Sequence, residues 1–108
     1  MLLKKNRADK EAVERIFNGG KFINSPNLTF KFILTNQSSA PRISFVAPKG
    51  IAKSAVKRNL LRRRGYAVLK KYIAHFPLGL LGVFLFKKYQ DDTTIIENEI
   101  KNILHKIN

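Results

Sequence analysis

The sequence contains no cysteine among its 108 residues, which excludes a disulfide framework and a thiolate metal site. It also lacks a long apolar run. The longest stretch, residues 76–86, is interrupted by Pro77, Gly79 and Gly82 and is too short to span a bilayer. The opening residues MLLKKNR lack the apolar segment and cleavage site of a signal peptide. We therefore expect a cytoplasmic protein that does not bind membranes.

Acidic residues are scarce and lie only near the two ends of the chain. The sequence has 21 Lys+Arg against 7 Asp+Glu, a formal net charge of +14. No acid occurs from Arg15 to Gln90, although fifteen basic residues fall in that segment. Such a one-signed surface attracts a polyanion such as nucleic acid. Because 44% of the residues are hydrophobic, we expect a single folded domain over residues 1–108, with residues 1–8 as a basic arm.

The densest basic segment is residues 53–64, KSAVKRNLLRRR, which holds six basic residues, one asparagine and no acid. On a helix, residues four apart share a face, so Arg58 lies above Arg62 and Asn59 above Arg63. Stacked like charges cost helix stability, which indicates a polyanionic partner. Arginine forks match phosphate geometry, and an asparagine amide both donates and accepts hydrogen bonds.

Hydrophobic periodicity predicts an α+β fold with the element order αβββαβα. Helical spacing and caps predict three helices, and alternation or a continuous apolar run predicts four strands. The predicted elements are a helix from the Asp9 cap to Asn18, strands at 21–24, 28–35 and 42–47, a long helix at about 52–75, a strand at 80–86 and a final helix after 94. The second and third strands are expected to pair as a hairpin, and the first helix is expected at the edge of the sheet.

The two later helices differ in their patterns. The apolar residues of the long helix, which include Val56, Leu60 and Leu61, are not confined to one stripe, so this helix is expected to pack on more than one side. The final helix has a clean apolar face. Thr94 and Glu97 have the spacing of a capping box at its start.

The chain resembles the protein component of bacterial ribonuclease P over nearly its full length. The resemblance rests on Asn6-Arg7, on Phe17 followed by Gly19-Gly20, and on residues 45–59, FVAPKGIAKSAVKRN, which lead into the signature Arg58-Asn59 and its basic continuation. The sequence departs from the family pattern at Leu60, where arginine is usual, and at Gly65.

The resemblance implies a fold and a function. The fold is a two-layer α/β sandwich with a four-stranded mixed sheet and a left-handed βαβ crossover, the ribosomal-protein-like fold of this family. The function is that of an accessory subunit of an endoribonuclease: it binds a catalytic RNA and the 5′ leader of precursor tRNA, and the leader is removed to give the mature tRNA 5′ end. The resemblance also implies Mg²⁺ held by the RNA, no catalytic residue or metal in the protein, no small-molecule substrate and a monomeric protein.

The resemblance assigns residues to two RNA-binding groups. The group expected on the catalytic RNA is Lys53, Lys57, Arg58, Asn59, Arg62 and Arg63. The group expected on the leader is Arg7, Val13, Phe17, Thr29, Lys31 and Val46. Lys4 and Lys5 are candidates for further phosphate contacts. A disordered N-terminal tail that makes no RNA contact is an equally good interpretation of these two residues. The spacing of Phe17 fits a core position equally well, whereas alternation places Lys31 on the surface.

Three other functions compete with this interpretation. A protein nuclease needs clustered carboxylates, but the only adjacent pair, Asp91-Asp92, is better explained by a turn and a helix cap, and neither His75 nor His105 has an acid at a relay spacing. A helix lying on a membrane surface ranks last, because the apolar residues of the basic helix are expected to pack in the protein core. A ribosomal or RNA-chaperone protein has the same composition and stays open as the alternative.

Overall fold

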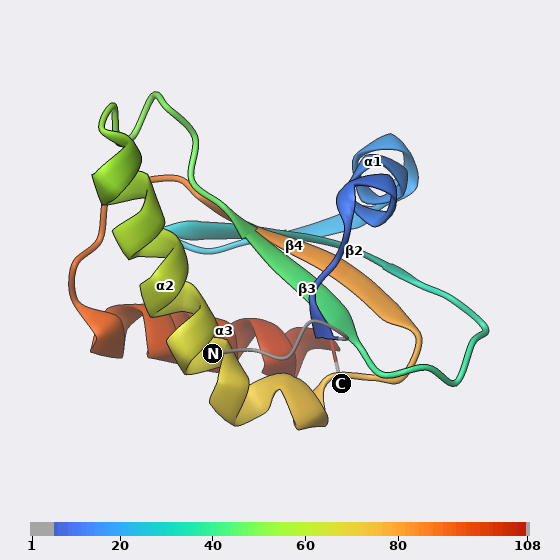
Figure 1. Ribbon diagram of the computed structural model, residues 1–108. Coiled ribbons are helices and arrows are strands. Elements are labelled where there is room, and N and C mark those ends of the chain that lie inside the picture. Colours follow the sequence, from blue (N-terminus) through green and yellow to red (C-terminus); the bar gives the residue numbers. More distant parts are fainter. Residues whose placement is uncertain (1–5, 108) are drawn as a thin grey trace.

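A computed structural model describes residues 6–107, and its elements follow the predicted order (Figure 1). The predicted arm residues Lys4 and Lys5 lie outside the described residues. The elements are α1 (Lys10–Gly19), β1 (Lys21–Asn24), β2 (Leu28–Leu34), β3 (Arg42–Val46), α2 (Ala55–Tyr72), the short 3-10 helix η2 (Ile73–His75), β4 (Leu80–Phe86) and α3 (Thr93–Ile107).

The four strands form one mixed sheet in the order β1-β2-β4-β3. β4 runs antiparallel to β2 and parallel to β3, so the predicted hairpin between β2 and β3 is wrong. Alternation identifies a strand and its faces but does not identify its partner. The continuous apolar run of β4 suits a strand with both faces covered, and this strand takes the position between β2 and β3.

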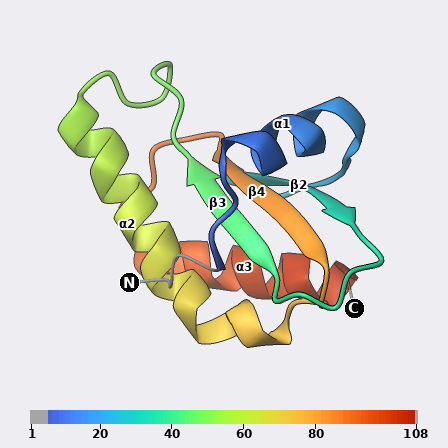
Figure 2. The same cartoon turned by 45° about the vertical axis from the view of Figure 1, so that its right-hand side comes forward.

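α2 and α3 cover one face of the sheet and enclose the main core (Figures 1 and 2). Alternate residues of the strands point into this layer, and Phe30 of β2 lies against Phe84 of β4 with ring centroids 4.3 Å apart. The predicted apolar face of α3 is buried in this core. Its fully or largely buried members are Ile96, Ile100, Ile103 and Leu104.

α1 packs on the opposite face, over the central strands β2 and β4, so its predicted place at the sheet edge is wrong (Figure 2). It buries Ala12 and Ile16 against the sheet. Val83 of β4 points to this face by alternation and is fully buried. The side of the sheet away from α2 and α3 therefore carries a second, smaller apolar contact, which fixes α1 in place.

The two helices nearest the candidate interface begin at side-chain caps. The Asp9 carboxylate accepts a hydrogen bond from the backbone N–H of Ala12 at 2.8 Å, which confirms the predicted cap of α1. α2 begins at Ala55 rather than near residue 52, because the Ser54 hydroxyl accepts from the backbone N–H of Lys57. The three preceding residues form a loop.

α3 begins at a different cap from the one predicted. The Asp92 carboxylate accepts from the backbone N–H of Thr94 at 2.9 Å, so the capping box of Thr94 and Glu97 is wrong, while the role of Asp92 as a helix cap is confirmed. Glu97 instead accepts a hydrogen bond from the Tyr72 hydroxyl and pairs with Lys71 at 3.6 Å. Its pKa is lowered by the Tyr72 hydrogen bond and by nearby lysines. These contacts join α3 to the end of α2.

The turn between β1 and β2 is fixed by a buried carboxylate of α3. Glu99 accepts hydrogen bonds from the Ser25 hydroxyl and from the backbone N–H of Asn27, the latter at 2.8 Å. Both the residue and Asn27 are buried. The edge strand β1 is thereby held to the body of the molecule at the end where it turns into β2.

Candidate nucleic-acid interface

The first half of α2 exposes most of its residues, and the second half is held against the sheet. Leu61 is the first buried residue of the helix, and Gly65, Tyr66, Val68 and Leu69 follow it. Val56 is 68% exposed and Leu60 is also exposed, so these two predicted apolar positions do not belong to the core. The basic segment therefore lies on the part of α2 that projects from the sheet (Figure 1).

One flank of α2 forms a groove beside β3, which we call the arginine groove. A hollow of about 240 Å³ is lined there by Arg7, Asn59, Arg62, Arg63 and Tyr66. Three of the predicted catalytic-RNA residues thus come together, because positions 59, 62, 63 and 66 share a helix face. An arginine of the N-terminal segment joins them.

A second hollow of about 430 Å³ continues the groove along β3 toward the start of α2, lined in part by Val46, Arg58, Asn59 and Arg62. Arg62 borders both hollows, and its Nε atom is buried without a hydrogen-bond partner among the described residues.

Arg58 has an intramolecular role that the sequence did not indicate. Its Nη1 atom donates to the carbonyl oxygens of Ala52 and Lys53, at 3.0 and 2.8 Å. These bonds hold the loop before α2 against the first turn of the helix. Part of its guanidinium is therefore occupied, although the residue also lines the second hollow.

The remaining predicted lysines lie away from the groove. Lys57 lies on the other flank of α2, with its ammonium 5.9 Å from the ring centroid of Tyr89. Arg64, seven residues along the same flank, lies at the same distance from that ring. Lys53 is exposed in the loop before α2. Of the six residues predicted for one RNA partner, four therefore line the two hollows, Lys57 lies on the other flank of α2 and Lys53 lies in the preceding loop.

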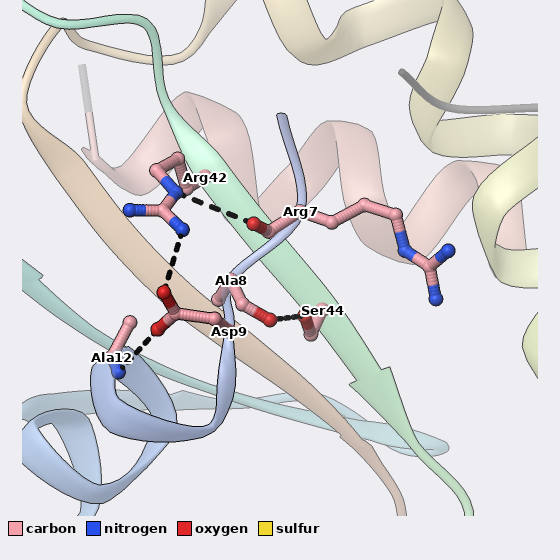
Figure 3. Close-up of polar contacts among 6 residues, drawn as sticks. All are labelled: Arg7, Ala8, Asp9, Ala12, Arg42 and Ser44. Atoms are coloured by element: carbon pink, nitrogen blue, oxygen red, sulfur yellow. Dashed lines mark hydrogen bonds and ion pairs between the residues drawn. The ribbon is translucent and has the colours of Figure 1, made fainter. Parts of the chain in front are cut away.

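Residues 7–9 cross β3 and are clasped to it by side-chain hydrogen bonds (Figure 3). Arg42 donates from Nε to the carbonyl of Arg7 and from Nη2 to the Asp9 carboxylate, at 3.3 and 3.1 Å. The Ser44 hydroxyl donates to the carbonyl of Ala8 at 2.6 Å. The Arg7 side chain points away from this clasp and lies over the Tyr66 ring, 4.7 Å from its centroid.

Arg7, which was predicted to bind the leader, thus has its guanidinium in the arginine groove beside residues predicted for the catalytic RNA, and its contact with the leader stays a prediction. The Tyr66 hydroxyl there accepts a hydrogen bond from the backbone N–H of Phe45 at 3.1 Å. Burial raises the pKa of Tyr66, but the pKa is lowered overall because the Phe45 N–H and the Arg7 guanidinium stabilise the phenolate. The groove is a locally electropositive environment.

The other predicted leader residues lie on the sheet face that carries α1. We call Val13, Phe17, Thr29 and Lys31 the α1 face. Phe17 is 44% exposed, so it is not a core residue, and Ile16 is the member of α1 that is fully buried. Lys31 is half-buried rather than fully exposed, and its ammonium lies 5.0 Å from the centroid of the Phe17 ring. Val46 also lines the second hollow, and the register, which aligns it with Leu85 and through it with Thr29, places it on the same sheet face as Thr29.

Two groups of residues were missed by the sequence analysis. Phe22 and Asn24 of β1 share the α1 face with Lys31 and Thr29, because the strand register pairs them. Their strand is only four residues long, which is too short for alternation to identify its faces. Tyr66 was missed as well, although it follows Arg62 by four residues, the spacing that places two residues on one side of a helix.

Two absences among the described residues concern a metal site and a membrane span. Residues 6–107 bring together no group of three or more His, Cys, Asp or Glu that could hold a metal ion. In the same part of the chain, no helix is long and apolar enough to cross a membrane.

Comparisons with known proteins give the family. A family model described as Ribonuclease P matches residues 3–108. The ribonuclease P protein component of Prochlorococcus marinus (strain MIT 9215) is 33% identical over 86 residues, which cover 76% of this chain and 67% of that protein. Two solved structures share the fold, each with a TM-score of 0.81. The RNase P protein of Staphylococcus aureus is 20% identical, with 97% of this chain and 100% of that chain covered. The RNase P protein from Thermotoga maritima is 19% identical, with 94% and 97% covered. The chain therefore belongs to the ribonuclease P protein family.

Proposed function

We propose that this chain is the protein subunit of a ribonuclease P. It binds the catalytic RNA of that enzyme through the arginine groove. It binds the 5′ leader of precursor tRNA on the α1 face. It thereby promotes endonucleolytic removal of the leader. The observation that carries the proposal is the set of unneutralised arginines in the groove. Among residues 6–107 the ion pairs are Arg42–Asp9 and Lys71–Glu97, so protein carboxylates do not neutralise Arg7, Arg62 or Arg63.

The groove has the donors that an RNA backbone requires. Arginine presents several N–H donors in a fixed plane and binds phosphate oxygens in pairs. The fixed hydroxyl of Tyr66 and the exposed amide of Asn59 add neutral hydrogen-bonding groups beside the charges. A folded RNA that enters this groove therefore gains hydrogen bonds as well as charge neutralisation.

The α1 face suits a different part of the RNA assembly. An exposed aromatic ring beside an ammonium binds single-stranded RNA of varied sequence, because every base has a face that can stack and every phosphate attracts a cation. Phe17 and Lys31 supply this pair. β3 beside the groove and β1 beyond the α1 face are the two edges of the sheet, about 14 Å apart at the usual strand spacing. One small protein can therefore bind two RNA segments at once.

The chemistry of cleavage belongs to the RNA in this proposal. Mg²⁺ would be held by the RNA rather than by this chain and would supply Lewis-acid chemistry there. The protein residues hold the leader and the catalytic RNA in position. Asp92 caps α3 and Glu97 bonds to Tyr72, so these acids have structural roles.

Two variants separate the two binding surfaces. Arg62→Ala should weaken binding to a bacterial ribonuclease P RNA, and Phe17→Ala should leave that binding intact but weaken the reconstituted enzyme's affinity for precursor tRNA. The affinity for mature tRNA, which lacks a leader, should not change in Phe17→Ala. Lys101→Ala on α3 is the control for loss of one exposed charge.

Equal losses in Arg62→Ala and Lys101→Ala would contradict a specific groove and would favour a general RNA-binding protein of the ribosomal or RNA-chaperone type. Equal effects of Phe17→Ala on precursor and mature tRNA would contradict the leader assignment.

A further inference from the structure

The phenylalanines of the chain divide sharply between core and surface. The sequence has eight, and six of them are buried. The two exposed ones are Phe17 on α1 and Phe22 on β1, which are 44% and 62% exposed. A single exposed apolar side chain needs no explanation. Both exposed rings, however, lie next to the same residue, Lys31.

The strand register places Phe22 beside Lys31. These residues are directly opposite each other in the antiparallel pair β1–β2, so their side chains leave the sheet on the same face. Their Cβ atoms are about 5 Å apart in such a pair. The ammonium of Lys31 lies 5.0 Å from the centroid of the Phe17 ring. Lys31 thus has an aromatic residue as its neighbour on each of two elements, Phe17 on α1 and Phe22 on β1.

Lys31 has donors to offer a ligand. Within residues 6–107 its ammonium makes no hydrogen bond or ion pair, and its contact is the Phe17 ring. The next pair along the strands is Asn24 and Thr29, in which the Thr29 hydroxyl donates to the Asn24 side-chain oxygen at 2.8 Å. The amide nitrogen of Asn24 remains at the exposed end of this row. Aromatic, cationic and amide groups therefore follow one another across the face.

We propose that Phe22 is a second stacking platform for single-stranded RNA, which extends the leader-binding surface from α1 onto the edge strand β1. One base stacks on Phe17 and another on Phe22, and the Lys31 ammonium contacts a phosphate between them. The inference rests on the proposed leader-binding function. It is argued for RNA because the Lys31 ammonium beside the Phe17 ring complements a phosphate, which an apolar protein partner does not supply.

The test uses the protein reconstituted with a bacterial ribonuclease P RNA and precursor tRNAs that carry 2-aminopurine at successive leader positions. Stacking quenches the fluorescence of this base, so the wild-type protein should show two quenched positions. Phe22→Ala should relieve one of them and weaken precursor affinity about tenfold, without changing affinity for mature tRNA. Phe22→Trp should keep both properties, and Phe22→Leu should lose them because leucine has no ring to stack.

Leu78→Ala is the matched control, because Leu78 is also 62% exposed and lies in the turn before β4. It should behave as the wild type. If the wild type binds precursor and mature tRNA equally, the leader-binding proposal fails and this inference fails with it. If the wild type prefers the precursor and Phe22→Ala or Phe22→Leu preserves that preference and both quenched positions, Phe22 is not a platform although the leader still binds.

Discussion

Gly65→Ala is expected to destabilise the protein, although alanine is ordinarily better than glycine inside a helix. Gly65 is buried in the middle of α2, where the helix crosses the ring of Phe45. A Cβ atom at this position would lie 2.5 Å from the nearest ring carbon of Phe45, against the usual 3.5–4.0 Å between carbon atoms. Either the ring or the helix must move by about 1 Å to admit it.

The Phe45 ring has little freedom to move. It is stacked on Phe84 with centroids 5.0 Å apart, and it meets the Tyr66 ring edge-on at 5.1 Å. Inserting a methyl group into such a contact costs about 1–3 kcal/mol, whereas the higher helix propensity of alanine recovers about 1 kcal/mol. Because the ring is held on two sides, we expect a cost of about 2–3 kcal/mol and hence a net loss of about 1–2 kcal/mol, which corresponds to a Tm lower by roughly 5–10 °C for a domain of this size.

Thermal and urea unfolding followed by circular dichroism would measure this loss. Gly19→Ala is the control, because Gly19 ends α1 and a Cβ there would meet nothing within 4 Å. It should leave stability unchanged or slightly raised. Combining Gly65→Ala with Phe45→Leu should cost less than the two changes added together, because the smaller side chain makes room. If Gly65→Ala stabilises the protein as much as Gly19→Ala does, the close approach of α2 to β3 does not require glycine.

Three further changes test contacts around the interface. Tyr66→Phe leaves the buried N–H of Phe45 without an acceptor and should lower the free energy of unfolding by about 1–3 kcal/mol in urea titrations, and an unchanged value would refute that hydrogen bond. Arg58→Ala should speed hydrogen exchange in the loop before α2, because Nη1 of Arg58 no longer donates to the carbonyls of Ala52 and Lys53, and unchanged exchange would contradict this role. The pKa of Asp9 is lowered from its ordinary 3.8, first by the hydrogen bond from the Ala12 backbone N–H and then by Arg42, so the folded state favours the carboxylate. The resulting gain in folding stability is present above about pH 4 and is lost as the pH falls through the folded-state pKa. The Tm difference between the wild type and Asp9→Asn should therefore shrink on acidification, and a constant difference would argue against the clasp.

Local patterns in the sequence predicted most elements but not their arrangement. The periodicity of α1 and α3, the alternation in β2 and the apolar run of β4 all identified the correct segments, since each depends on neighbours along the chain. The hairpin between β2 and β3 was wrong because partner choice depends on β4, which arrives about forty residues after β3 begins. The start of α2 shifted because Ser54 provides the cap.

The candidate interface was predictable to a similar extent. Helical spacing brought Asn59, Arg62 and Arg63 to one flank, as the structure shows. The position of Arg7 in that groove depends on hydrogen bonds between segments about 35 residues apart along the chain, and such contacts cannot be predicted from hydrophobic periodicity. The departure at Gly65 likewise has a tertiary cause, since the glycine admits the Phe45 ring.

Cleavage of precursor tRNA by a bacterial ribonuclease P RNA at low magnesium, with and without this protein, tests the central claim most directly. The account predicts strong stimulation by the protein, with the cut at the mature 5′ end of the tRNA and a smaller stimulation by Arg62→Ala. Tight RNA binding without any stimulation, repeated with the RNA from the organism that makes this protein, would contradict the account.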